Sequence, residues 1–317
     1  MNLMNEEKIK HFRSFTVAHP EYREALDTIH RSMEATRLRG EPSCVILLGD
    51  PGTGKTRICD DILTELGPPT KKHTADGVCI INPVIYCRVP NNATIKTLVT
   101  RLLNCFETYT KYQSVDALEF RLFNILHTCQ TVMIILDEWQ HLLRSGTGHA
   151  LQSAADWVKV LTDIYSGEVM LVGPPACERM IDQHQALADR FPYRARLSPF
   201  SLASPEHYSN YLKLIRAFAI DIKESMGFIE IPPLTDEKVL LGVYAATGGN
   251  MRALRVLLNA SLTNALNRND SNLLISDFSM AACQVKLATR LTPQNPFDKT
   301  CSELKKIIFT SSKKCTN

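Results

Sequence analysis

A phosphate-binding loop constrains the fold of this chain more than any other feature of its sequence. Residues 49–56 read Gly-Asp-Pro-Gly-Thr-Gly-Lys-Thr, which fits the pattern Gly-x-x-x-x-Gly-Lys-Ser/Thr in full. An unbroken apolar run, residues 44–48, precedes the loop, and a predicted helix of residues 55–66 follows it. Such a run is typical of a strand buried on both faces of a parallel sheet. The motif and its flanks therefore predict a nucleotide-binding α/β domain, and they argue against a simple glycine-rich turn with a solvated lysine.

The residue types of the loop suit the binding of a nucleoside triphosphate. Glycines let backbone N–H groups turn inward around phosphate oxygens, and the N-terminus of the following helix adds a favourable dipole. Lys55 is expected to reach the β- and γ-phosphates, and Thr56 to offer its hydroxyl to Mg²⁺. The residues expected to bind the nucleotide are Gly49, Asp50, Pro51, Gly52, Thr53, Gly54, Lys55, Thr56 and Arg57.

An apolar strand that ends in two carboxylates forms the second motif, because residues 132–138 read Val-Met-Ile-Ile-Leu-Asp-Glu. We expect Asp137 to hold Mg²⁺, directly or through water, and Glu138 to orient and deprotonate the attacking water. The alternative is an acidic strand end that begins a turn. A second acid after the metal ligand favours hydrolysis over a small-molecule kinase, and the lack of an Asn-Lys-x-Asp motif favours adenine. The two motifs together predict an ATPase whose cofactors are ATP and Mg²⁺.

Strand and helix patterns alternate over residues 40–200, which predicts a central, largely parallel sheet flanked by helices. Residues 67–83 are rich in glycine and proline and are predicted to form a loop. After residue 199 only helical patterns remain, so we expect a small all-helical lid domain. The predicted strands are residues 44–48, 84–89, 131–136, 169–172 and 195–197. The predicted parts are an N-terminal helical segment (1–38), the α/β domain (39–200), the lid (201–290) and a flexible basic tail (291–317) with one short helix.

Composition excludes some classes of protein. Lys plus Arg is 36 and Asp plus Glu is 33, so the net charge is +3, and any binding of DNA must depend on local charge. The ten cysteines form no Cys-x-x-Cys pair, which favours reduced, buried thiols. The first residues are polar, and no apolar run approaches the ~20 residues of a membrane span. We therefore expect a cytoplasmic protein with no membrane partner.

Three arginines are candidates for contact with the nucleotide. Arg190 lies in the segment Leu-Ala-Asp-Arg-Phe (187–191), and in an oligomeric ATPase an arginine here can reach the γ-phosphate bound by the neighbouring subunit. Arg194 is the second candidate for this role. The alternative for Arg190 is that it is a surface arginine paired with Asp189. Arg252 follows Gly248-Gly249 in the first turn of a predicted helix, where it could report the state of the nucleotide. A plain helix–helix turn with solvated arginines is the alternative reading there.

These pieces, in this order, resemble the AAA+ ATPases, and within them the TniB/TnsC group of transposition ATPases, over about residues 10–290. The more specific matches are the stretch from Phe12 to Pro20, the segment Leu-Asp-Glu-Trp-Gln-His-Leu-Leu (136–143) and the segment 187–191. The resemblance implies ATP-bound rings or short helical filaments on duplex DNA. Such assemblies link a target-selector protein of the TniQ type to the transposase and disassemble on hydrolysis.

The chain departs from the pattern of the AAA+ proteins at two positions. Many of them place a polar sensor at the end of the fourth strand, where this chain has Gly173 followed by Pro174-Pro175. Trp139 replaces the commoner Ile or Ala. We therefore expect slow hydrolysis, which would suit a regulator.

The resemblance also suggests which residues contact DNA, namely basic residues between the second strand and the acidic strand: Lys96, Arg101, Lys111 and Arg121. Acidic residues in the same region make solvated surface charges an equally good reading. Two other functions stay open. One is an ATP-switched signalling or scaffold NTPase that does not depend on DNA. The other is a replication initiator or loader, although the ~27 residues after 290 are too few for a winged-helix module.

Overall fold

The computed structural model describes residues 3–40, 43–74, 77–91, 93–108, 114–143, 148–268 and 272–314. The chain divides into two compact units. We call Glu21–Leu197 the α/β unit, and Met1–Pro20 together with Ser198–Asn317 the helical unit. None of the described helices is both long and apolar enough to cross a membrane. The division differs from the sequence-based one at the N-terminus, because the predicted segment 1–38 is shared between the units.

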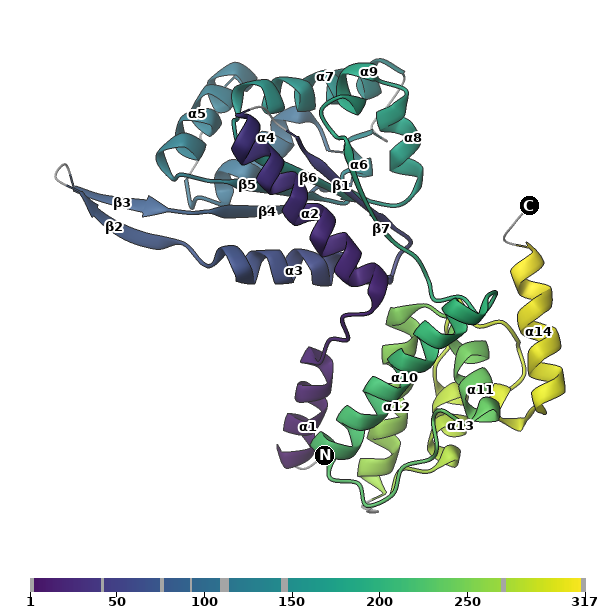
Figure 1. The fold of residues 1–317 in the computed structure, drawn as a ribbon. Helices are drawn as coiled ribbons and strands as arrows, with labels where there is room; N and C mark the ends of the chain where they lie inside the picture. Colours follow the sequence, from purple (N-terminus) through teal and green to yellow (C-terminus); the bar gives the residue numbers. More distant parts are fainter. Residues whose placement is uncertain are drawn as a thin grey trace. The chain divides into compact units, whose positions relative to one another are not determined.

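A five-stranded parallel sheet forms the centre of the α/β unit, in the order β4-β5-β6-β1-β7 (Figure 1). The strands are β1 (Val45–Gly49), β4 (Val84–Arg88), β5 (Met133–Asp137), β6 (Glu168–Gly173) and β7 (Tyr193–Leu197). Strands β1, β5 and β6 are buried along their whole length, as the unbroken apolar run of residues 44–48 predicted for β1. The predicted α/β class with a parallel sheet is confirmed.

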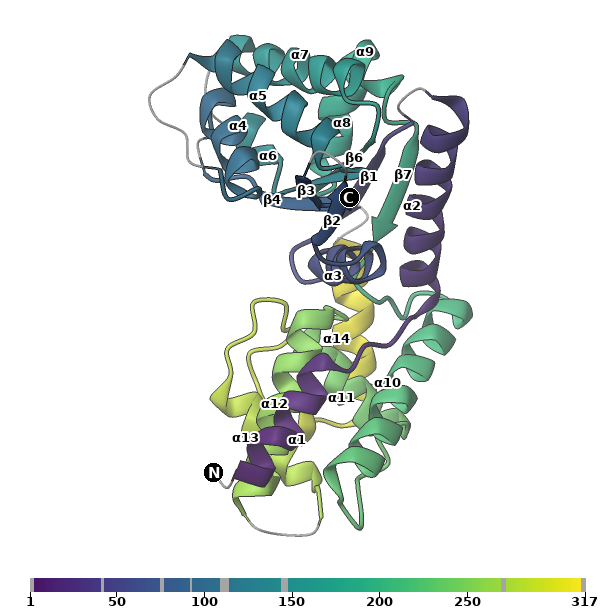
Figure 2. The same ribbon diagram turned by 90° about the vertical axis from the view of Figure 1, so that its left-hand side faces the viewer.

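Helices cover both faces of this sheet (Figures 1 and 2). On one face, α2 (Pro20–Arg39) and α3 (Lys55–Leu66) share a hydrophobic core with Val45, Leu47 and Ile135. The residues that alternate with these, such as Ile46 and Ile134, belong to the core on the other face. The helices packed on that face are α4 (Ile95–Asn104), α5 (Val115–Thr128), α6 (Gln140–Leu143), α7 (Gly148–Ile164), α8 (Ala176–Asp182) and α9 (Gln185–Ala188).

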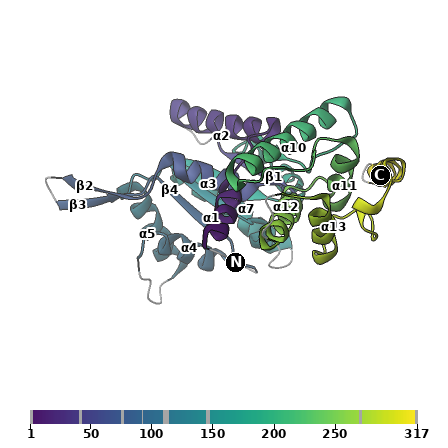
Figure 3. The same cartoon turned by 90° about the horizontal axis from the view of Figure 1, so that it is seen from below.

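The predicted loop of residues 67–83 is wrong in part, because it contains a β-hairpin. Strands β2 (Thr70–Thr74) and β3 (Gly77–Ile81) pair antiparallel as a separate two-stranded sheet. Figure 3 shows this hairpin projecting from the α/β unit, beyond α4 and α5. Pro68 and Pro69 immediately precede Thr70, the first residue of β2, so they remove no backbone N–H that the strand pairing needs.

The helical unit consists of α1 (Leu3–Ser14), α10 (Pro205–Met226), α11 (Glu237–Thr247), α12 (Met251–Asn267), α13 (Ile275–Gln284), the 3₁₀-helix η1 (Pro296–Asp298) and α14 (Cys301–Lys314). Its last part does not form the expected flexible tail. Leu304 and Ile308 of α14 are buried in the core of the unit, and Lys305 pairs with Glu237 of α11 at 2.6 Å. Two apolar residues four positions apart put one face of α14 on the core, in spite of the surrounding lysines.

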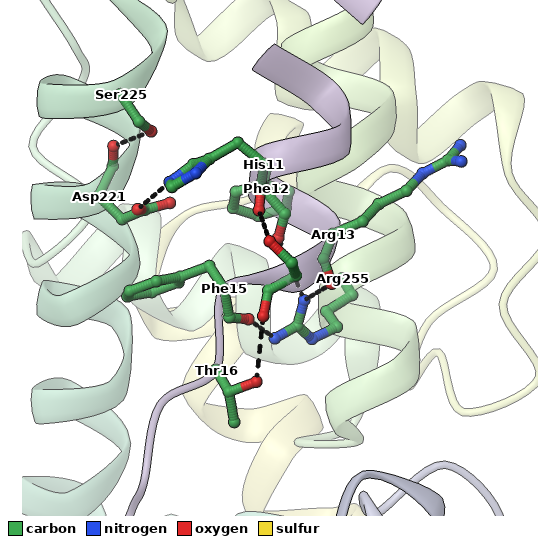
Figure 4. A network of polar contacts seen from close by, with 9 residues as sticks. His11, Phe12, Arg13, Phe15, Thr16, Asp221, Ser225 and Arg255 are labelled. Carbon is green, nitrogen blue, oxygen red and sulfur yellow. Dashed lines mark hydrogen bonds and ion pairs between the residues drawn. The ribbon is translucent and has the colours of Figure 1, made fainter. Parts of the chain in front are cut away.

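Helix α1 is attached to the helical unit by polar contacts at its C-terminal end (Figure 4). Arg255 of α12 donates hydrogen bonds to the carbonyl oxygens of Phe12 and Arg13, both at 3.3 Å, and to that of Phe15. His11 contacts the carboxylate of Asp221 on α10 at 3.1 Å. Since the last four carbonyl groups of a helix have no partner within the helix, Arg255 supplies donors that α1 itself lacks.

Candidate nucleotide-binding site

The two sequence motifs meet at the carboxyl-terminal edge of the parallel sheet. In the strand register Arg88 pairs with Asp137, Asp137 with Val172, and Leu48 with Gly173. The phosphate-binding loop follows directly after β1, and Glu138 follows directly after β5. In open α/β sheets, ligands bind at this edge. The structure thus brings together the residues predicted for nucleotide and metal binding.

Glycines shape the loop where other residues would not fit. Gly54 is the N-cap of α3 and has a φ of 113°, which side-chain-bearing residues rarely adopt. A Cβ atom on Gly49 would lie 2.5 Å from the carbonyl oxygen of Leu197 and 2.7 Å from Thr53 Oγ1. The loop therefore passes close to β7 and opens at the N-terminus of a 12-residue helix. This is the arrangement in which backbone N–H groups and the helix dipole favour an anion.

The side chain of Lys55 lies folded against the loop. Its Nζ donates hydrogen bonds to the carbonyl oxygens of Gly49, at 2.6 Å, and Asp50, at 3.1 Å. The hydroxyl of Thr53 donates to the same Asp50 oxygen at 2.9 Å. Lys55 is therefore already held over the concavity of the loop. Arg57, also predicted to bind the nucleotide, instead lies 3.8 Å from Asp61 one turn along α3.

Asp137 is a buried carboxylate, with 4% of its surface exposed. Its Oδ1 accepts a hydrogen bond from the backbone N–H of Glu138 at 2.8 Å, and its Oδ2 accepts one from the Tyr86 hydroxyl at 2.6 Å. Burial and this bond to Asp137 raise the pKa of Tyr86 well above its usual value, so Tyr86 stays a donor. The carboxylate of Asp137 and the exposed hydroxyl of Thr56 are oxygen donors of the kind that Mg²⁺ prefers, so the residues present fit the predicted metal.

Glu138 has an unusual backbone and several polar neighbours. Its φ of 57° is rare for a residue other than glycine. Gln140 Nε2 donates to its carboxylate at 2.5 Å, Arg88 Nη2 lies at 3.7 Å and His141 Nε2 at 3.9 Å. Glu138 is thus turned towards Gln140 and Arg88. A water molecule that approached Glu138 would compete with these donors.

The structure places the predicted arginines in three different settings. The backbone carbonyl of Arg190 accepts from Cys44 at the start of β1, so this residue lies at the edge of the sheet opposite to the phosphate-binding loop. Its side chain pairs with Asp163, through Nε at 2.9 Å and Nη2 at 2.5 Å. Arg194 is level with Ile46 in the strand register and pairs with Asp182 at 3.0 Å. Arg252 is exposed in the first turn of α12, in the helical unit.

The candidate DNA contacts are spread over α4 and α5. Lys96 and Arg101 are exposed on α4, whereas Arg121 is half-buried on α5. Lys111 lies outside the described residues.

Sequence reasoning missed three residues of the site, namely Tyr86, Arg88 and Gln140. Tyr86 and Arg88 are two positions apart at the end of β4, which is the neighbour of β5 in the sheet. Polar residues at the end of a predicted strand were the available signal, but the strand order was needed to place them beside Asp137 and Glu138. Gln140 lies two positions after Glu138. It belongs to the segment 136–143, which the sequence singled out only because it resembles the TniB/TnsC group.

Comparisons with known proteins identify a sequence family and solved structures with a similar fold. The sequence family described as "Bacterial TniB protein" matches residues 8–201. A comparison with curated protein sequences finds no match. Among solved structures, Cdc6p from Pyrobaculum aerophilum is similar with a TM-score of 0.61 at 15% identity, over 87% of this chain and 70% of that one.

Two proteins of Aeropyrum pernix have the same fold. Its ORC1 protein, solved in complex with DNA, has a TM-score of 0.57 at 17% identity, over 84% of this chain and 67% of that one. Its ORC2 protein, solved with ADPNP and ADP, has a TM-score of 0.58 at 13% identity, over 87% and 71%. These likenesses show an AAA+ fold, and the sequence match shows the family. The chain belongs to the TniB family.

Proposed function

We propose that this chain is an ATP-hydrolysing regulator of DNA transposition. It oligomerises on duplex target DNA, links a target-selector protein of the TniQ type to the transposase, and disassembles on hydrolysis. The observation that carries the proposal is the meeting of the phosphate-binding loop with Asp137 and Glu138 at one sheet edge, in a member of the TniB family.

The residues at the carboxyl-terminal edge of the sheet have different roles in ATP hydrolysis. Backbone N–H groups of residues 50–56 bind the phosphates, and the Lys55 ammonium exchanges its two loop carbonyls for the β- and γ-phosphates. Thr56 and Asp137 would hold Mg²⁺, and the ion would neutralise charge on the phosphates. Glu138 orients the attacking water and takes its proton. Because Glu138 first has to leave Gln140, basal turnover is slow.

The position of Arg190 supports assembly of several subunits. This residue lies at the sheet edge opposite to the phosphate-binding loop, so it does not serve the nucleotide of its own chain. In a head-to-tail ring or filament, the same residue faces the nucleotide of a neighbour. Arg194 is the second candidate for this role, and Arg252 is proposed to report the nucleotide state to the helical unit. The DNA complex of the Aeropyrum pernix ORC1 protein supports duplex DNA as the partner.

Light scattering and electron microscopy, with and without ATP and duplex DNA, test the proposal. We expect DNA-bound assemblies only when ATP and Mg²⁺ are present. Glu138→Gln should trap these assemblies, because the nucleotide binds but water is not activated, and Lys55→Ala should abolish nucleotide binding. A chain that hydrolyses ATP but stays monomeric with DNA and nucleotide would contradict the proposal. DNA-independent assembly with no stimulation of turnover by DNA would instead support the scaffold alternative.

A further inference from the structure

One face of the β2–β3 hairpin carries two apolar side chains that are more than half exposed. In its antiparallel register Lys71 pairs with Ile80 and His73 with Val78, so these four side chains lie on the same face. Val78 is 58% exposed and Ile80 is 52% exposed. We call Lys71, His73, Val78 and Ile80 the ribbon face.

The opposite face of the hairpin lies towards α5. Lys72 pairs with Cys79 on this face, and the Cys79 thiol donates to the carbonyl oxygen of Thr128, at the end of α5, at 3.3 Å. This contact and the bond from the Asn82 N–H to the Cys129 carbonyl oxygen (2.8 Å) anchor the base of the hairpin to the unit. Figure 3 shows the hairpin projecting from the unit, and the exposures of Val78 and Ile80 show that the ribbon face is open to solvent.

The charge of the hairpin has one sign. The described residues of β2 and β3 include two lysines and a histidine but no acidic side chain. The acid that precedes them, Glu65 of α3, is paired with His30 at 2.8 Å, and Asp76 lies outside the described residues. The two strands therefore carry cations along β2 and exposed apolar side chains along β3.

A solvated surface explains lysines but does not explain an exposed valine and isoleucine beside them. Cations positioned for phosphates and apolar groups positioned for base edges or sugars account for both. A two-stranded ribbon also fits the space, since the major groove of B-DNA is ~12 Å wide and admits such an element. Each five-residue strand spans about 17 Å, which is long enough to follow the groove past several base pairs.

We propose that the β2–β3 hairpin enters a groove of duplex DNA with Val78 and Ile80 of the ribbon face against the bases or sugars. Lys71 on this face and Lys72, which is exposed on the opposite face, contact phosphates on the two sides of the groove. The proposal rests on the proposed function, since it names a part of the chain that contacts the same DNA. It adds a contact surface to the candidates on α4 and α5, and it gives the hairpin a role that the nucleotide site does not require.

The salt dependence of DNA binding tests the lysines. A labelled duplex is titrated with the full chain and saturating ATP over about 50–200 mM salt. The slope of log K against log salt is negative, and loss of one phosphate contact reduces its magnitude by about 0.9. Lys71→Ala/Lys72→Ala should therefore reduce the magnitude of the slope per bound subunit by about 1.8. The matched control is Lys213→Ala/Lys223→Ala, which removes two exposed lysines of α10 and should leave the slope unchanged. The double change to arginine at 71 and 72 should restore the wild-type slope.

The apolar residues have a separate test. Val78→Ser/Ile80→Ser should weaken DNA binding about tenfold at an unchanged salt slope, because apolar contacts release no counterions. Melting temperatures equal to that of the wild type show that these exposed substitutions leave the fold intact.

The outcomes separate the two proposals. If the wild-type chain with ATP fails to bind duplex DNA, the proposed function fails and the hairpin contact with it. If the wild type binds but the lysine pair and its control change the slope equally, only the hairpin proposal is overturned. It is also overturned if Val78→Ser/Ile80→Ser abolishes ATP-dependent assembly without DNA, because the ribbon face would then contact protein.

Discussion

The indole of Trp139 packs against Gly173 at the end of β6, where it leaves little room for a side chain. A Cβ atom on Gly173 would lie 3.2 Å from Trp139 Cδ1 and 2.7 Å from Cys177 Sγ. The indole of Trp139 is 1% exposed, so it cannot move aside into solvent. The two departures from the AAA+ pattern are therefore neighbours in space, because Cys177, Gln140 and Trp139 together crowd the place in which a side chain at position 173 would begin.

A double-mutant cycle should show this dependence. Gly173→Ser alone should destabilise the fold by about 1–3 kcal/mol through overpacking, and Trp139→Ala alone by about 3–5 kcal/mol through a cavity. In the double variant part of both penalties disappears, because the serine enters the cavity, and we expect a coupling of at least about 0.5 kcal/mol in urea unfolding. Gly242→Ser, which faces Phe297 in the helical unit, is the control and should be additive with Trp139→Ala. Additivity of Gly173→Ser as well would disprove the link.

Release of Glu138 should raise ATP turnover. Gln140→Met keeps the length of the side chain but removes the donor that holds the Glu138 carboxylate at 2.5 Å. A hydrogen bond to a charged group is worth about 1.5–3 kcal/mol, so turnover at saturating ATP should rise about tenfold or more. Arg88→Ala should give about a twofold rise, since this arginine is 69% exposed and lies 3.7 Å away. A fall in turnover for Gln140→Met would mean that Gln140 orients the reacting water instead.

Glu168 should make stability depend on pH. Burial raises its pKa from 4.5 to about 7, against the opposing effect of hydrogen bonds from Ser32 and Thr36. The geometry agrees, because Ser32 Oγ lies 2.6 Å from the Ser43 carbonyl oxygen and 2.5 Å from Glu168 Oε1. The Ser43 carbonyl and the Glu168 carboxylate compete for the single hydroxyl hydrogen of Ser32, so a proton on Glu168 allows both bonds to form at once.

The sign follows from the raised pKa. Between pH 4.5 and about 7 the folded chain keeps a proton on Glu168 that the unfolded chain has lost, so stability falls as the pH rises through this window. Glu168→Gln donates to Ser32 and accepts from Thr36 without titrating. At pH 8 it should exceed the wild type by up to about 3 kcal/mol in free energy of unfolding, with little difference near pH 4. Glu224→Gln, at an exposed site of α10, is the control, and a gain from Glu168→Gln that did not vary with pH would contradict the prediction.

Arg255 should hold α1 on the helical unit. Arg255→Met removes the donors to the carbonyl oxygens of Phe12, Arg13 and Phe15. Hydrogen exchange of the α1 amides should become faster by a factor that corresponds to about 1–3 kcal/mol, while β1 and β5 keep their protection. Arg252→Met removes a neighbouring exposed arginine and should leave α1 unchanged. Equal exchange in the two variants would show that other contacts hold the helix, such as the packing of Phe12 on Phe218 and the bond from His11 to Asp221.

Local signals predicted the sheet and the loop well. Strands β1, β5 and β6 are apolar apart from Asp137 at the end of β5 and Glu168 at the start of β6, which is typical of strands covered on both faces. The loop motif specifies its own geometry, because the glycines at 49 and 54 are required by contacts and dihedral angles within a few residues.

Features that depend on distant partners were not predictable in this way. The hairpin has no alternating pattern, since its exposed face carries valine and isoleucine as well as lysine. Helix α14 reads as a basic tail unless its contacts with α11 are known. The pairing of Arg190 with Asp163 joins residues 27 positions apart, and the neighbours of Glu138 depend on strand order.

The position of α1 has a consequence for how the chain folds during synthesis. Its contact residues on α10 and α12, Asp221 and Arg255, follow it by more than 200 positions, and the whole α/β unit lies between. The α/β unit is therefore an insertion into a discontinuous domain, and it can fold on the ribosome before the rest of its host exists. The contact between Phe12 and Phe218 can form only after the chain around Phe218 has left the ribosome. Truncation of the first 20 residues would accordingly damage the last domain to be made, and not the first.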